Sequence, residues 1–142
     1  MSPLLKPGLS FEWTYTVPRR STVPQLYHDT PFCRDMPDVL ATGYMVGMME
    51  LACLNGMMPY VDWPREQSVG VLVHFSHLAA TPPGMTLRIR GEVTAVEGRR
   101  VAFRVEAWDG IDKIAEGVHE RMLIDPSRFN AKVARKKERA GL

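Results

Sequence analysis

A long apolar segment, residues 43–58, constrains the fold more than any other feature, and its spacing predicts a helix. Apolar residues recur there at three- and four-residue intervals and leave few polar positions on any side. We expect Thr42 to be the N-cap and Pro59 to mark the end of the helix. A helix with so little polar surface should be enclosed by the rest of the chain, because apolar surface is driven out of water.

Five segments of alternating polar and apolar residues predict strands, one before the helix and four after it. They are residues 11–17, 69–79, 85–96, 101–107 and 113–124. Turn sequences such as Asp109-Gly110 between the last strands are typical of antiparallel hairpins. We therefore expect a single α+β domain over residues 1–142, with an antiparallel sheet wrapped around a central helix. A flat, open sheet is the alternative, and the apolar helix argues against it.

Two stretches fall outside this pattern. Residues 18–37 hold four of the eleven prolines and predict a loop or lid, whereas residues 126–142 form a basic C-terminal tail. The tail has two interpretations, a solvated, frayed end or a cationic arm near an anionic ligand such as a phosphate. Its cations are Lys132, Arg135, Lys136, Lys137 and Arg139. The net charge of +2 is too small to indicate a nucleic-acid partner.

The remaining composition indicates a cytoplasmic protein without a cofactor. Cys33 and Cys53 have no metal-ligand spacing and imply no disulfide framework, which favours a reducing compartment; Cys53 should be a buried thiol. The N-terminus lacks an apolar run long enough for a signal peptide or membrane span. His28 and His119 have no ligand-like spacing with other donors, so we expect no metal.

Glu50 and His77 are the residues that suggest chemistry. Glu50 lies in the middle of the apolar helix, where a carboxylate is costly to bury without partners. Alternation along residues 71–78 turns His77 toward the helix and His74 away from it. Glu50 on a solvent-exposed stripe and His77 as a satisfied core residue are the alternatives. An inward carboxylate and an inward histidine together favour a tuned acid–base site.

Thr42 and Gly43 begin the helix at a point that suits a developing oxyanion. The hydroxyl of Thr42 can simply cap the helix, but the first N–H groups there are free, and Gly43 lets a carbonyl approach the backbone. Thr42 and Glu50 are eight positions apart, or about 12 Å along a helix, so they cannot bond directly. Substrate or water between them, a bend at Thr42, or a second subunit would reconcile the two.

Several motifs resemble the fluoroacetyl-CoA thioesterase family over nearly the whole chain. They are DVLATGYMVGMMELAC (38–53), HLAATPPG (77–84), VEGRR (96–100), HER (119–121) and FNAKV (129–133). The resemblance implies a dimeric hot-dog fold without a metal, and an acyl-CoA substrate hydrolysed to a carboxylate and CoA. It places the catalytic threonine, glutamate and histidine on Thr42, Glu50 and His77. It also places substrate-binding residues on Gly70 and Arg121.

The chain departs from this family in the lid, where phenylalanines linked to fluoroacetyl selection are replaced by Cys33 and Met36. Phe32 compensates only in part. A flexible Met36 makes an adaptable pocket wall, which favours a broader short-chain acyl-CoA activity over fluoroacetyl-CoA. An enoyl-CoA hydratase of the same fold and a non-catalytic acyl-CoA-binding protein are the alternative functions.

Overall fold

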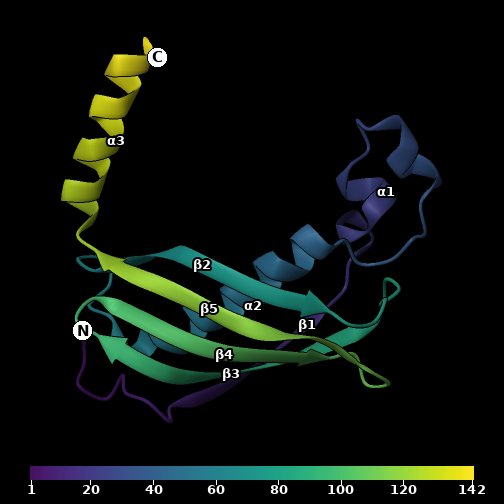
Figure 1. Ribbon diagram of the computed structural model, residues 1–142, viewed down its shortest axis with the longest axis horizontal. Coiled ribbons are helices and arrows are strands. Elements are labelled where there is room, and N and C mark those ends of the chain that lie inside the picture. Colours follow the sequence, from purple (N-terminus) through teal and green to yellow (C-terminus); the bar gives the residue numbers. More distant parts are fainter.

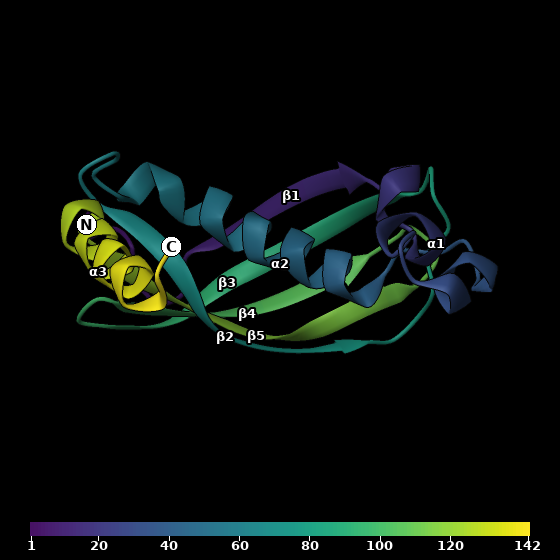
Figure 2. The ribbon, with the colours of Figure 1, turned by 90° about the horizontal axis from the view of Figure 1, so that it is seen from above.

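An antiparallel sheet of five strands curves around one long helix in the computed structural model, which describes all residues 1–142 (Figure 1). The strands are β1 (Ser10–Thr16), β2 (Gln67–His77), β3 (Thr86–Glu97), β4 (Arg100–Trp108) and β5 (Lys113–Ile124). They lie in the order β1-β3-β4-β5-β2, so β1 and β2 are the two edges. Helix α2 (Thr42–Met57) lies along the concave face of the sheet (Figure 2). The predicted sheet around a central helix is therefore confirmed.

The core forms where α2 meets the inner face of the sheet. Five α2 residues are buried, namely Met45, Met49, Ala52, Cys53 and Met57. They pack against the inward residues of the middle strands, among them Leu87, Ile89, Val101, Phe103 and Val105. The helix begins one residue earlier than expected, because Ala41 is the N-cap and Thr42 is already helical. The prediction that Thr42 caps the helix is thus wrong, and its side chain is free for another partner.

Strand β2 does not alternate regularly along its whole length. Its pairing with β5 shifts between Gly70 and Leu72, which leaves Val71 in a bulge. Beyond the bulge, Val73 pairs with His119 and His77 pairs with Ala115, so both face α2. His74 pairs with Val118 on the outer face. The predicted directions of His77 and His74 are confirmed, whereas Val71 lies in the bulge and has no partner on β5.

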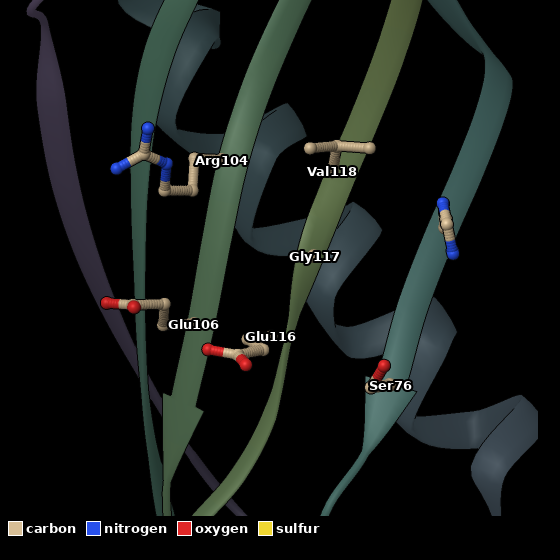
Figure 3. A pocket seen from close by; sticks show the side chains of 7 residues that line it. Ser76, Arg104, Glu106, Glu116, Gly117 and Val118 are labelled. Carbon is tan, nitrogen blue, oxygen red and sulfur yellow. The ribbon is translucent and has the colours of Figure 1, made fainter.

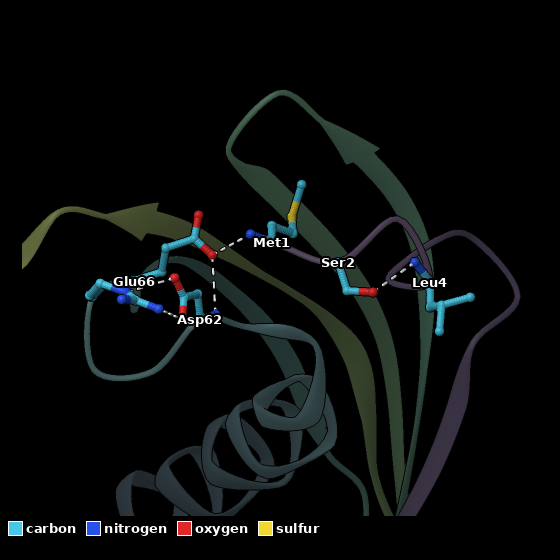
Figure 4. A network of polar contacts seen from close by, with 6 residues as sticks. Met1, Ser2, Leu4, Asp62 and Glu66 are labelled. Carbon is cyan, nitrogen blue, oxygen red and sulfur yellow. Dashed lines mark hydrogen bonds and ion pairs between the residues drawn. The ribbon is translucent and has the colours of Figure 1, made fainter.

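Residues 18–37, the segment that the sequence predicts to be a loop or lid, contain three short helical segments. These are η1 (Arg19–Ser21), α1 (Val23–Leu26) and η2 (Pro31–Asp35), and they gather at the end of the molecule where α2 begins (Figures 1 and 2). A further turn, η3 (Met58–Tyr60), follows α2 directly. Figure 4 shows how the N-terminus is held near that turn: Glu66 accepts hydrogen bonds from the Met1 ammonium and the Asp62 backbone N–H. These contacts fix the loop that leads into β2.

The basic tail is a helix, α3 (Pro126–Ala140), rather than a frayed end. The Asp125 carboxylate caps it by accepting hydrogen bonds from the backbone N–H groups of Ser127 and Arg128. Gly141 ends it in the left-handed conformation that suits glycine, at φ 71°. α3 leaves the end of β5 and projects past β2 without packing on the sheet (Figure 1). None of the helices combines the length and apolar character needed to cross a membrane.

Candidate active site

Thr42 and His77 form the first of two polar pairs along α2. The Thr42 hydroxyl lies 2.8 Å from Nδ1 of His77, which joins the first turn of α2 to the last residue of β2. Nε2 of His77 is buried and has no hydrogen-bond partner. Burial lowers the pKa of His77 below its ordinary 6.5, so the imidazole is neutral at pH 7. A neutral histidine bonded to a hydroxyl can accept or relay its proton.

The pKa of His77 gives a testable pH profile. If neutral His77 is required, kcat/KM should be on a plateau at neutral pH and fall in acid with a midpoint below 6.5. His77→Gln should lower kcat/KM by about two orders of magnitude and remove that acid limb. Steady-state rates between pH 5 and 8 test both points. An unchanged acid limb in the variant would assign the titration to another group.

Glu50 and Arg121 form the second pair. The Arg121 guanidinium donates a hydrogen bond of 2.8 Å to Oε1 of Glu50. Ser68 holds the same guanidinium through its hydroxyl, at 2.9 Å, and its backbone carbonyl, at 3.0 Å. Arg121 is only 4% exposed, whereas the Glu50 side chain is 40% exposed. Arg121 therefore holds one oxygen of Glu50, while Oε2 accepts no hydrogen bond and remains open to a substrate or water.

His119 belongs to this pair, although its role was missed in the sequence. Nδ1 lies 2.7 Å from the Leu72 carbonyl oxygen and so carries the proton, which leaves Nε2 to accept from Arg121 at 3.3 Å. The ring is fully buried, and burial lowers its pKa, which keeps it neutral. His119 thus positions the guanidinium that holds Glu50. The usable sequence feature was the two-residue spacing of His119 and Arg121, which puts both on one face of β5.

Two glycines leave space around these pairs. A Cβ at Gly70 would lie 2.7 Å from Oε1 of Glu50 and 3.2 Å from Cε1 of His119, so any side chain there would displace the carboxylate. A Cβ at Gly43 would lie 2.8 Å from the Tyr27 hydroxyl. Tyr27 therefore reaches from the lid to the start of α2, a contact that nothing in the sequence had indicated.

The other predicted residues lie farther from the chemistry. Met36 follows η2 and is 48% exposed, and Phe32 is also exposed. Cys53 is buried as expected, and burial raises the pKa of its thiol to about 12, so it is not a nucleophile. No hydrogen bond joins the Thr42–His77 pair to the Glu50–Arg121 pair, in keeping with their predicted separation along α2.

A shallow hollow on the opposite side of the sheet is not part of this site. His74, Ser76, Arg104, Glu106 and Glu116 line it with Gly117 and Val118, on the face turned away from α2 (Figure 3). Lys113 pairs with both glutamates beside it. This open, charged hollow has no contact with the two polar pairs.

Comparison with known proteins decides the family. A family model described as fluoroacetyl-CoA-specific thioesterase matches residues 25–127. The chain belongs to this family. The fluoroacetyl-CoA thioesterase of Streptantibioticus cattleyicolor is 46% identical over 132 residues, which cover 93% of this chain and 94% of that protein. These matches confirm the resemblance drawn from the motifs.

Solved structures support the same fluoroacetyl-CoA-specific thioesterase family. A fluoroacetyl-CoA thioesterase superposes with a TM-score of 0.88 at 46% identity, covering 92% of this chain and 96% of that one. A Thermus thermophilus hypothetical protein, described as a thioesterase superfamily member, has a TM-score of 0.85 at 30% identity, covering 99% and 98%. The hot-dog fold expected for this family is thereby confirmed.

Proposed function

We propose that the protein hydrolyses short-chain acyl-CoA thioesters, with Thr42, Glu50 and His77 as its catalytic residues. The observation that carries this proposal is the environment of the Glu50 carboxylate. Arg121 holds one of its oxygens at 2.8 Å, the other oxygen is free, and Gly70 leaves space beside it. A carboxylate fixed in this way is prepared to act on a thioester held beside its free oxygen.

The reaction can be written with the groups at hand. The free oxygen of Glu50 removes a proton from water, and the water oxygen bonds to the thioester carbon. The charge that develops on the carbonyl oxygen is stabilised by the Thr42 hydroxyl, oriented by His77, and the Gly43 N–H of a second copy of the chain, because within one chain these groups lie about 12 Å along α2 from Glu50. The carbon–sulfur bond then breaks, Glu50 passes the proton that it took from water to the sulfur, and CoA is released with a carboxylic acid that ionises to the carboxylate in water. Direct attack by Glu50, followed by hydrolysis of the anhydride, gives the same products.

The acyl group is proposed to be short but not restricted to fluoroacetyl. Arg121 and Gly70 bound the space beside Glu50, and Met36 with Cys33 stands in the lid where the family has phenylalanines. An unbranched, flexible methionine adapts to several shapes of acyl group. We therefore expect acetyl- and propionyl-CoA to be hydrolysed at rates comparable to that of fluoroacetyl-CoA.

One assay separates this proposal from its alternatives. With crotonyl-CoA as substrate, free thiol and the enoyl absorbance are followed together, and acetyl-CoA is run in parallel. A thioesterase releases thiol from both compounds. Loss of the enoyl absorbance without thiol would instead identify a hydratase, and tight binding without either change would identify a carrier.

We also propose that two copies pair through β2. This edge strand contains no lysine, arginine or proline, the residues that usually protect an exposed edge. Val71, Leu72 and Val73 on it are 47%, 41% and 51% exposed, which is unusual for three consecutive apolar residues. Pairing would cover this surface and bring the two sites close to one interface.

The free thiols of Cys33 and Cys53 support a reducing location, which we propose is the cytoplasm.

A charge in the middle of β2 should test the pairing. Val73→Lys should convert a dimer into a chain of 16.0 kDa, because the lysine would be buried only in the paired state. Light scattering after gel filtration gives the mass. The control is Ile111→Lys, since Ile111 is 81% exposed in the turn between β4 and β5. A wild-type protein that already runs at 16.0 kDa would contradict the dimer.

A further inference from the structure

One face of α3 carries an uninterrupted row of positive charge. Lys132, Arg135, Lys136 and Arg139 recur at three- and four-residue spacing and line one open groove along the helix. All four are exposed, and none of them forms an ion pair. Like charges at these spacings repel, so this arrangement weakens an isolated helix. A bound anion would reduce this repulsion more than water alone does.

Capping at both ends preserves the helical spacing of this face. Asp125 caps its start and Gly141 ends it, so α3 keeps its shape although it does not pack on the sheet. It begins two residues after β5, the strand that carries Arg121. The basic face is therefore connected by a short stretch of chain to Arg121 of the Glu50–Arg121 pair.

We propose that this basic face binds the phosphate groups of the CoA part of the substrate. CoA carries a diphosphate and a ribose phosphate at the end opposite its thioester, which matches a row of cations set apart from the acyl site. The inference rests on the proposed thioesterase function and extends it by assigning a site to the nucleotide end of the substrate.

The direction of α3 places this site beside a second copy. α3 projects past β2, the free edge of the sheet, in both ribbon views (Figures 1 and 2). It follows Ile124, which pairs with Gln67 at the start of β2. Antiparallel pairing of two β2 strands sets the start of one beside the end of the other. In the proposed dimer, α3 of one copy thus stands near the Thr42–His77 pair of its partner.

Other polyanions match the helix less well. A membrane-bound helix needs a broad apolar face, whereas Phe129 and Val133 are the only large apolar residues on α3. Nucleic-acid binding is usually supported by a strongly basic domain, and this chain has a net charge of only +2. The positive charge of one helix face is sufficient to bind a small phosphate-bearing ligand.

The test compares two charge-neutralised variants. The α3 variant replaces the four cations of the basic face by glutamine, which keeps the helix propensity nearly unchanged. The matched control replaces four exposed cations of the body that form no ion pair, namely Lys6, Arg90, Arg99 and Arg104. Calorimetry measures the affinity for CoA, and steady-state rates are measured with acetyl-CoA and with acetyl-pantetheine, which lacks the phosphates.

We expect the α3 variant to bind CoA about tenfold more weakly than the wild type and to show a matching rise in KM for acetyl-CoA, since several exposed charge pairs act together. Its kcat/KM for acetyl-pantetheine should equal that of the wild type, and the control should match the wild type throughout. Unchanged CoA affinity, an equal loss on acetyl-pantetheine, or dissociation of the dimer would each overturn the assignment. A wild type that binds CoA through α3 but hydrolyses neither thioester would overturn the proposed function and leave the binding site standing.

Discussion

Glu50→Gln should lower kcat by about two to four orders of magnitude while leaving the fold intact. Glutamine has nearly the same shape and can still accept the hydrogen bond from Arg121, but it cannot take a proton or attack a carbonyl. Because the Glu50 side chain is 40% exposed, loss of its charge should shift Tm by about 4 °C or less. Thiol release and a thermal melt on the same sample give both quantities.

A control for this variant is Glu97→Gln, which removes an exposed carboxylate at the end of β3, outside the two pairs. It should keep wild-type kcat. If Glu50→Gln also keeps it, Glu50 is only a structural partner of Arg121, and catalysis must be assigned to the Thr42–His77 pair alone.

Gly70→Ala should lower kcat/KM by about two orders of magnitude. The added methyl would lie 2.7 Å from Oε1 of Glu50, so the carboxylate must move, and a displacement near 1 Å is enough to cost that much in rate. The atom that gives way is the end of a flexible side chain, so stability should change little. Activity and a thermal melt, measured together, separate the two effects.

Gly47→Ala is the matched control for an added methyl, because nothing lies within 4 Å of a Cβ at that position. Alanine should stabilise α2 by about 0.5–1 kcal/mol and leave turnover unchanged. Wild-type activity in Gly70→Ala would show that the space beside Glu50 is not used by the reacting groups.

Regular periodicity made part of this site visible in the sequence. A glutamate in the middle of an apolar helix and a histidine on the apolar face of a strand can be recognised without coordinates, because helices and strands repeat at fixed intervals. The direction of His77 follows from alternation alone. The enclosed helix and the antiparallel sheet follow for the same reason.

What the sequence did not reveal depends on contacts between distant segments. The partner of Thr42 is 35 positions away, and the tie from Arg121 to Glu50 spans 71 positions. His119 was dismissed because it was considered as a metal ligand, whereas its neighbours are a carbonyl and a guanidinium. The bulge at Val71 interrupts alternation, and only the pairing of β2 with β5 places it. Asp125 and Gly141 are suitable capping residues for a helix in the basic tail, but the many charges of this segment had favoured a frayed end.

The most direct measurement of the central claim is the release of free thiol from acetyl-CoA by the purified wild-type protein at neutral pH. We predict saturable release in proportion to protein concentration, with a kcat between about 1 and 10³ s⁻¹. Release no faster than in buffer, for acetyl-, propionyl- and fluoroacetyl-CoA alike, would contradict the account.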